Sequence, residues 1–330
     1  MSERAARVLL FESFAVQLSA LDDTTDVGMD RPFGFRENQP VSWFRRSPQT
    51  SNQHCLYCGV FVGLGSPIPS DREHLIARNF VPPGALGDTS FNFIFRACIE
   101  CNRRKGDAER HVSSVTIFNS PGRTSDASVN AAAIRKGASD FHPHMPGVRV
   151  ADASHHRTYK TNLGPAELSF SMIGPPQVDN EAVCTLACYQ VQALFSLVTT
   201  ADPREGKTTT LLRPDLWRYL GIYPWRDWGN VQAAELCKRV RAWPIILQFS
   251  TANGYFRAIM RATDGPPDEW FWGLEWNKSL RVIGSIFEGD EAPSAFRDLP
   301  MFTWSRVTPN LRIRAEVPEP DGQDLLFGQP

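Results

Sequence analysis

The feature that most constrains this sequence is a pair of Cys-x-x-Cys motifs, Cys55–Cys58 and Cys98–Cys101. Each motif can present two thiolates to one metal ion, and two motifs complete the tetrahedral shell that zinc prefers. Four protein ligands leave no position for water, so such a zinc ion is structural rather than catalytic. A block this small gains from a metal because it cannot build a large apolar core alone. We therefore predict a structural Zn²⁺ site with these ligands: Cys55, Cys58, Cys98 and Cys101.

The remaining cysteines argue against a disulfide framework. The chain has seven cysteines in 330 residues, and the three outside the motifs are Cys184, Cys188 and Cys237. An odd count with four metal ligands favours a reducing, cytoplasmic setting. No secretory signal is visible at the N-terminus, and the apolar runs stop short of the ~20 residues that a membrane span needs. We expect a cytoplasmic protein that does not cross a membrane.

A second group of polar residues lies between and just after the cysteine motifs. It consists of Glu73, His74, Asn92 and Asn102. A neutral imidazole can take a proton from water, and a carboxylate and an amide oxygen suit Mg²⁺. Neighbouring side chains on a strand point to opposite faces, so Glu73 and His74 can serve one substrate only at a bend or strand end. The group therefore indicates metal-assisted hydrolysis.

The block from Cys55 to Ser114 resembles the HNH endonuclease family, which has a ββα-metal fold. The matching elements are the two cysteine motifs, Glu73-His74, the central Asn92, and Asn102 followed by Lys105. The block is most similar to the zinc-containing HNH nucleases related to McrA-type restriction enzymes. The resemblance covers about 60 of the 330 residues and carries no information about the others.

The resemblance implies a role for each matching residue. His74 would be the general base, while Glu73 and Asn102 would hold one Mg²⁺ or Mn²⁺ ion at the scissile phosphate. Asn92 would brace the loop and orient His74. The basic run Arg103, Arg104 and Lys105 would contact phosphates without reading sequence. The chain departs from the commoner pattern at Glu73, where Asp is more frequent. The extra methylene of Glu changes how far the carboxylate extends toward a metal ion.

The resemblance implies DNA as the substrate, with RNA left open, and a place in bacterial defence or a mobile element. The formal net charge is −1, so nucleic-acid binding must come from a local basic patch. The alternative function is a non-catalytic zinc module that binds nucleic acid or protein through the same cysteines. That module has no need of Glu73, His74, Asn92 and Asn102 together.

Other histidines are weaker candidates. His54 and His111 lie close to the block, but surface or packing roles suit both better. We expect His142 and His144, and likewise His155 and His156, to be loop histidines, because no carboxylate or cysteine spacing accompanies them.

The pattern of the whole chain predicts an α+β fold with a zinc-stabilised ββα-metal block and a C-terminal α+β domain. The C-terminal domain would contain helices at 181–198 and 230–241, then an antiparallel meander of strands at 245–250, 255–262, 270–276 and 280–287. Asn253-Gly254 indicates a hairpin between the first two strands. We expect this domain to select the target, to form oligomers or to hold a protein partner.

The predicted organisation has five parts. They are an N-terminal segment of unknown role (1–50), the HNH block (51–115), a connector with little core (116–165), the C-terminal domain (166–315) and an acidic tail (316–330). We expect the tail to fray unless Leu325, Leu326 and Phe327 dock.

Overall fold

The structure is a computed structural model that carries side chains. It describes residues 40–87, 90–153, 155–174, 176–200, 217–224, 231–264, 269–287, 292–301, 303–308, 311–314 and 323–328. Most of the predicted N-terminal segment, residues 1–39, lies outside these ranges, and so does Asn230, the first residue of the helix predicted at 230–241.

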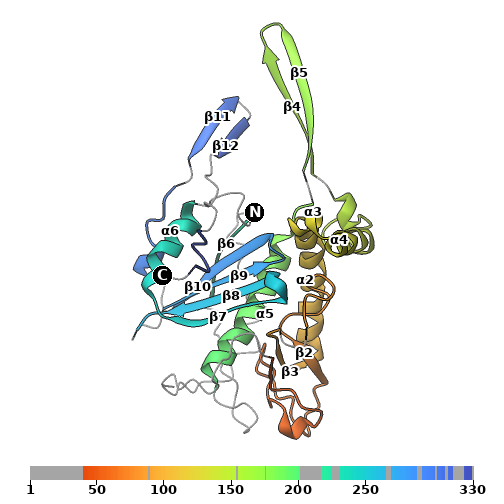
Figure 1. Ribbon diagram of the computed structural model, residues 1–330, viewed down its shortest axis with the longest axis vertical. Coiled ribbons are helices and arrows are strands. Elements are labelled where there is room, and N and C mark those ends of the chain that lie inside the picture. The colour runs from red at the N-terminus through yellow and green to blue at the C-terminus, as the bar shows by residue number, and fades with distance from the viewer. Residues whose placement is uncertain are drawn as a thin grey trace.

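Helices and antiparallel strands both contribute, which confirms the α+β class (Figure 1). The helices are α2 (Ile99–Phe118), α3 (Gly122–Ser125), α4 (Ala127–Ser139), α5 (Asn180–Thr199) and α6 (Val231–Arg239). Short 3-10 helices cover Pro48–Thr50, Val150–Asp152, Val240–Ala242, Ala252–Gly254 and Ser294–Phe296.

Within the described residues, the strands belong to four separate sheets. They are β1 (Val41–Ser42), β2 (Ser70–His74), β3 (Phe93–Cys98), β4 (His155–Leu163), β5 (Ala166–Gly174), β6 (Trp217–Pro224), β7 (Ile245–Thr251), β8 (Phe256–Ala262), β9 (Trp270–Trp276), β10 (Leu280–Ile286), β11 (Trp304–Thr308) and β12 (Leu311–Arg314). The sheet orders are β1-β3-β2, β6-β10-β9-β8-β7, β4-β5 and β11-β12.

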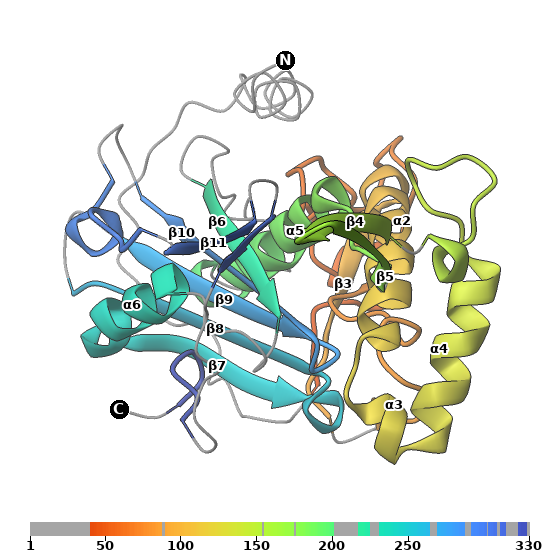
Figure 2. The same ribbon diagram turned by 90° about the horizontal axis from the view of Figure 1, so that it is seen from above.

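The five-stranded sheet is buried on both faces because its strands alternate between two apolar sets. Trp270, Trp272 and Trp276 belong to the core shared with α5, whereas Phe271 belongs to a smaller cluster under α6. Figure 2 shows α5 on one side of this sheet and α6 on the other. The predicted meander and its Asn253-Gly254 turn are confirmed within one or two residues, and both turn residues have positive φ.

Helix α5 lies between the sheet and α2. It is long and apolar enough to cross a membrane by length and composition, with a hydropathy of 1.5, but 61% of that window is buried in the fold. Its Tyr189 ring packs against Tyr57, 4.8 Å between centroids, and its Gln190 accepts a hydrogen bond from Trp276. Within the described residues, α5 therefore has the surroundings of a core helix.

The predicted connector contributes to the main core. Its α4 begins at Ala127, and the Asp126 side chain caps the helix by accepting hydrogen bonds from the N–H groups of Ser128 and Val129. Val129, Ala132 and Ala133 on its buried face belong to the hydrophobic core that also contains Cys55 and its neighbours. The same core thus runs from the cysteine block through the connector to the large sheet.

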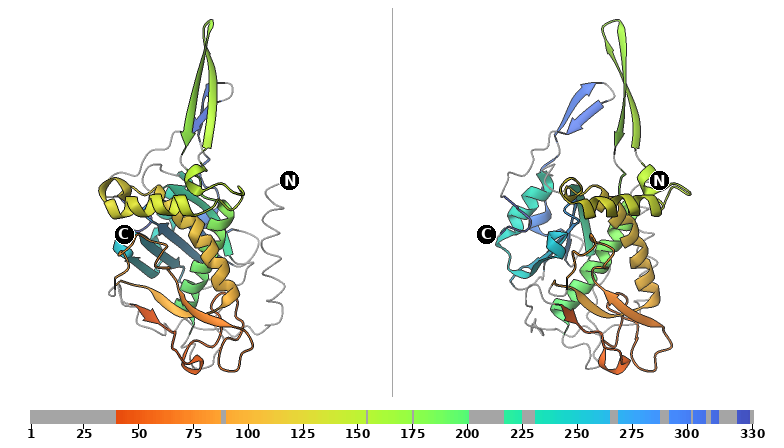
Figure 3. Two further views of the ribbon diagram at one scale, coloured as in Figure 1. Left: turned by 90° about the vertical axis from the view of Figure 1, so that its right-hand side faces the viewer. Right: turned by 45° about the vertical axis from the view of Figure 1, so that its right-hand side comes forward.

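Two ribbons project from this body. The strands of β4–β5 and of β11–β12 extend beyond the helices at the top of Figure 1, and Figure 3 shows the same projection from two other sides. Neither ribbon was predicted. Thr158 and Ser171 pair across β4–β5 on an exposed face, where little apolar patterning marks a strand.

The described part of the C-terminal tail, residues 323–328, docks on the fold. Leu326 and Phe327 are buried in the cluster under α6. The Asp324 carboxylate binds Arg257 at 2.6 Å and Arg281 at 2.9 Å, and Arg281 in turn binds the buried Glu275. Asp324 of the tail and Glu275 of the sheet therefore together balance the charges of two arginines.

Buried hydrogen bonds fasten the cysteine block to the sheet. The amide of Asn277, in the β9–β10 turn, donates to the Phe80 carbonyl at 3.1 Å and to Thr116 Oγ1 at 2.8 Å. The Thr251 hydroxyl donates to the Phe91 carbonyl at 2.8 Å. These bonds join segments more than 150 residues apart.

We predict that Asn277→Ala lowers the free energy of unfolding by about 2–3 kcal/mol, because two buried acceptors lose their donor. The matched control is Lys278→Ala, which changes the next residue of the same left-handed turn, φ 53°, and removes a contact of the Lys278 ammonium with the Tyr255 ring. That control should cost less than about 1 kcal/mol. Urea denaturation followed by tryptophan fluorescence measures both, and equal losses would contradict the role assigned to Asn277.

Candidate functional site

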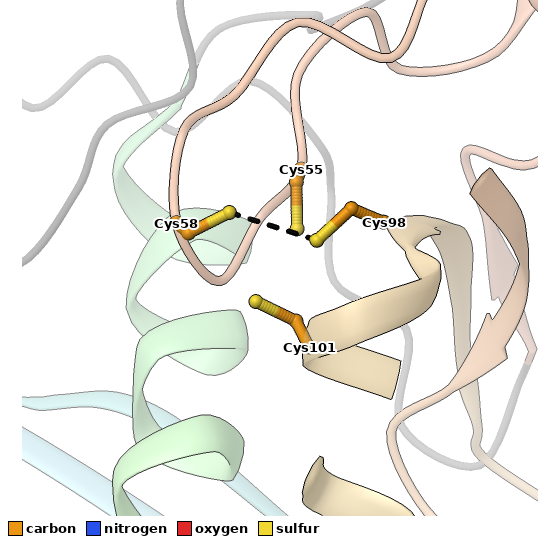
Figure 4. A group of neighbouring side chains, drawn as sticks. All are labelled: Cys55, Cys58, Cys98 and Cys101. Carbon is orange, nitrogen blue, oxygen red and sulfur yellow. Dashed lines mark hydrogen bonds between the residues drawn. The ribbon is translucent and has the colours of Figure 1, made fainter. Parts of the chain in front are cut away.

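The four predicted cysteine ligands come together in the structure. Their sulfur atoms all lie within 4.8 Å of one another, and Cys58 Sγ is 3.8 Å from Cys98 Sγ. A tetrahedral zinc ion with Zn–S bonds of about 2.3 Å requires sulfur–sulfur distances of about 3.8 Å. Figure 4 shows the side chains converging from a loop and from the start of α2. The cluster can hold a zinc ion, as the sequence predicts.

Local backbone geometry explains why the first cysteine pair forms a ligand loop. The Gly59 N–H donates to the Cys55 carbonyl and the Cys55 N–H donates to the Val60 carbonyl, both at 2.8 Å. Gly59 has φ 73°, a left-handed conformation that glycine adopts without steric cost. The second pair needs no such loop, because Cys98 ends β3 and Cys101 lies in the first turn of α2.

The β2–β3 hairpin and α2 position the acid–histidine pair. Strand β2 runs antiparallel to β3, with Glu73 opposite Phe95 and His74 opposite Ile94. The Glu73 side chain is buried while His74 is half-buried, so the two point to opposite faces as strand geometry requires. Strand β2 ends at His74, so the acid–histidine pair lies at a strand end, as the sequence analysis required for the two residues to serve one substrate.

Glu73 belongs to a buried polar cluster with Tyr57, Lys105 and Glu109. The Lys105 ammonium lies 2.7 Å from Glu73 Oε1 and 2.7 Å from Glu109 Oε1, and it donates to the His74 carbonyl at 3.0 Å. The Tyr57 hydroxyl donates to Glu73 Oε1 at 3.1 Å. Both of these contacts to Glu73 use its Oε1.

The pKa values in this cluster follow from burial and charge. Burial alone would lower the pKa of Lys105, but the carboxylates of Glu109 and Glu73 raise it, so the ammonium stays charged. Burial raises the pKa of Glu109, although Lys105 opposes this shift. Burial and the Glu73 carboxylate raise the pKa of Tyr57 well above its ordinary value, so the phenol remains a donor.

The position of Lys105 argues against its predicted phosphate contact. Its side chain is only 1% exposed, and its three N–H groups have the three acceptors described above. A lysine at this place neutralises carboxylates and ties α2 to the end of β2. The sequence motif therefore marks a structural cation at Lys105 rather than a surface one.

Four polar residues of the block were predicted as site residues: Glu73, His74, Asn92 and Asn102. Of these, Asn102 and His74 have side chains that make no hydrogen bond within the described part of the chain. Asn102 precedes Lys105 by three residues, so it shares the face of α2 that meets β2. Burial and then the Arg72 charge lower the pKa of His74, although Glu73 opposes them. The imidazole is accordingly neutral near pH 7 and can accept a proton.

Asn92 holds the segment that follows His74. Its side-chain amide donates to the Ile76 carbonyl at 3.0 Å, and its Oδ1 accepts the Ile76 N–H at 3.2 Å. The buried Asn92 side chain thus satisfies both the N–H and the carbonyl of Ile76. This geometry fixes the backbone two residues beyond His74.

The remaining basic candidates lie on the exposed side of α2. Arg103 and Arg104 both pair with Glu100, at 3.2 Å and 2.7 Å, with roughly half or more of each side chain exposed. Exposed pairs of this kind are worth at most about 1 kcal/mol, so a phosphate can replace Glu100 at little cost.

The rival histidines have packing roles. His54 packs edge-on against Phe61, and His111 Nε2 accepts the N–H of Asp179 at 2.9 Å. Burial lowers the pKa of His111 to about 4. His142 and His144 lie beside His111, and His144 pairs with Asp179 at 2.9 Å. Tyr57, by contrast, is a site residue that sequence reasoning missed, because an aromatic inside a Cys-x-x-Cys motif gives no sign of its partner.

We predict that Cys98→Ser removes bound zinc and unfolds the block, because a structural metal supplies folding energy. The matched control is Cys188→Ser on α5, which lies outside the cluster and should retain one zinc per chain. Metal content by plasma emission spectrometry and thermal unfolding by circular dichroism measure both effects. Purified wild type without zinc, or a folded and zinc-loaded Cys98→Ser variant, would show that the thiolates do not bind this metal.

Comparisons with protein-family models, with curated proteins and with solved structures found no match for this chain.

Proposed function

We propose that this protein is a metal-dependent endonuclease of the HNH type that hydrolyses phosphodiester bonds in DNA. The observation that carries the proposal is the placing of Glu73, His74 and Asn102 around one junction. Glu73 and His74 end β2, Asn102 lies in the first turn of α2, and Lys105 joins the two elements. The thiolate cluster at the start of α2 fixes this junction from the other side.

The donor set suits a hard divalent cation. The Glu73 carboxylate and the amide oxygen of Asn102 are hard oxygen ligands of the kind that Mg²⁺ and Mn²⁺ accept. Such an ion, when bound, would stabilise negative charge on the scissile phosphate and the leaving oxygen. Lys105 holds the Glu73 carboxylate in place through Oε1 and offsets its charge, while Tyr57 donates to the same atom.

His74 would act as the general base on the attacking water. Its imidazole is neutral because burial and Arg72 lower its pKa, and it has no hydrogen bond to break before it accepts a proton. The Ile76–Asn92 bonds and the Lys105 contact with the His74 carbonyl hold the backbone on both sides of this residue. Arg103 and Arg104 would bind neighbouring phosphates from the exposed face of α2.

A non-catalytic zinc module is the competing function. It would use the same cysteines and the same arginines, but it gives no reason for a neutral histidine, a carboxylate and an amide at the junction of β2 and α2. Catalysis therefore separates the two. A role in bacterial defence or a mobile element is an expectation from the family resemblance alone.

We predict that wild type nicks supercoiled plasmid only with Mg²⁺ or Mn²⁺ present, and that His74→Ala cuts about 10²–10⁴-fold more slowly, the usual contribution of a general base. The control is His144→Ala, which removes an imidazole that is 56% exposed and lies outside the proposed site. It should cut at the wild-type rate. Equal cutting by His74→Ala, or no cutting by wild type with any divalent ion, would leave the zinc module as the function.

The cleavage rate should also depend on pH through His74. A general base works in its neutral form, so activity is full above the His74 pKa and falls as the pH drops below it. Because that pKa is lowered, the acid limb should lie below the ordinary histidine range. Arg72→Gln removes a charge that lowers this pKa and should move the limb to higher pH. A limb above the ordinary range in wild type would exclude His74 as the base.

A further inference from the structure

A cavity of about 500 Å³ lies between α2, α4 and the segment that follows β2. Its lining includes Ala77, Gly106, Arg110, Arg135 and Lys136. Two of these residues are on α4, which belongs to the predicted connector and not to the HNH block. In Figure 2, α4 runs beside α2 on the side away from the large sheet.

The cavity adjoins the proposed active site. Ala77 follows His74 by three residues, and its N–H donates to Glu109, which shares the Lys105 ammonium with Glu73. On α2, Asn102, Gly106 and Arg110 are spaced four residues apart and share one face. Arg110 lies about 12 Å beyond Asn102 at the helix rise, which is the axial span of roughly three or four nucleotides in one strand.

The cavity lining has more cations than acids: Arg110, Arg135 and Lys136 stand against Glu109 and Asp140. Within the described residues, the side chains of Arg135 and Lys136 form no ion pair or hydrogen bond. Of the two acids in the lining, Glu109 binds Lys105 and Asp140 accepts the Ser114 hydroxyl. Arg110 pairs with Asp107 at 3.3 Å on an exposed surface, a contact that a ligand can displace.

Of the two cations on α4, Lys136 is the one whose charge is more costly to bury, because Arg135 is exposed. Burial lowers the pKa of Lys136, and the Asp140 carboxylate offsets this shift only in part, so an anionic ligand in the cavity would further stabilise the ammonium. Its neighbour Arg135 is exposed at the rim of the cavity. The pair thus offers one half-buried and one accessible charge on adjacent positions.

Gly106 gives a separate sign that the cavity is kept open. Glycine inside a helix costs about 1 kcal/mol relative to alanine. Apart from its chain neighbours and the backbone of its own helix, no atom lies within 4 Å of the point where a Cβ would be, so packing against other segments does not require glycine here. A missing side chain beside cations allows the close approach of a bulky anionic group.

We propose that this α2–α4 cavity binds a backbone phosphate of the nucleic-acid strand that is being cut, with Lys136 and Arg135 as its contacts. The inference rests on the proposed nuclease function, since a strand held at Asn102 would continue along α2 to Arg110. The cavity is larger than a phosphate group and leaves room for the adjoining sugar. It would position the strand without reading its sequence.

The test is DNA binding by the full chain across a salt series, in a His74→Ala background that prevents cutting. Fluorescence anisotropy with a labelled duplex gives the dissociation constant, and its logarithmic slope against salt counts phosphate contacts. Arg135→Gln and Lys136→Gln should each weaken binding several-fold and reduce the slope by about 1. Lys238→Gln, the same charge change on an exposed position of α6, should alter neither quantity.

Gly106→Gln tests the same cavity by filling it. It should weaken DNA binding while leaving the unfolding temperature equal or higher, because Gln is the better helix former. That combination excludes damage to the fold as the cause. In the otherwise wild-type chain, Arg135→Gln should raise KM for plasmid cutting and leave kcat nearly unchanged.

The salt slopes and the plasmid cutting test the cavity and the nuclease function separately. Unchanged salt slopes in both α4 variants would overturn the proposed phosphate binding by the α2–α4 cavity. If wild type still cuts plasmid in that case, the nuclease function stands. Titration with inorganic phosphate separates a strand from a small ligand. If Lys136→Gln loses phosphate binding but keeps the DNA slope, the cavity serves a free phosphate compound. Conversely, altered slopes with no cutting by wild type would keep the cavity and refute the nuclease.

Discussion

Four sulfur atoms packed within 4.8 Å of one another are the constraint on which the rest of the block depends. These distances fit the tetrahedral shell of a zinc ion, whose positive charge would offset the repulsion between thiolates. The cluster joins the Cys55–Val60 loop to the residue where β3 becomes α2. That junction sets the direction of α2, and with it the positions of Asn102, Lys105 and Glu109.

A second constraint is electrostatic. Two buried carboxylates, Glu73 and Glu109, share the single ammonium of Lys105, and its remaining N–H binds the His74 carbonyl. Removing one partner of such a group is costly because a buried charge is left uncompensated. The same lysine therefore holds a candidate metal ligand and the backbone of the candidate base. A divalent cation at the Glu73 carboxylate would add positive charge that this cluster can accept, since two carboxylates face one ammonium.

The sequence predicted those parts of the fold whose signals are local. The cysteine spacing, the alternation of Trp270, Phe271 and Trp272, and the Asn253-Gly254 turn each specify a geometry within a few residues. The burial of Lys105 could not be foreseen, because Lys in a run of basic residues has the pattern of an exposed face. The β4–β5 ribbon was missed because exposed polar residues such as Thr158 and Ser171 do not alternate with a recognisable apolar set. The cavity cations on α4 were missed because proximity to α2 is a tertiary property.

One feature of the fold, the core shared by the cysteine block and the large sheet, changes what the metal does for the molecule. In a separate zinc module, loss of the ion melts only the module. Here Tyr57, inside the ligand loop, packs on Tyr189 of α5, and Phe80 packs edge-on against Trp276 of the sheet. A zinc ion that binds only the folded state stabilises it by RT ln(1 + [Zn]/Kd), and the shared packing passes that free energy to the whole connected core. Free zinc in the cell would then set, by mass action, how much of the chain is folded.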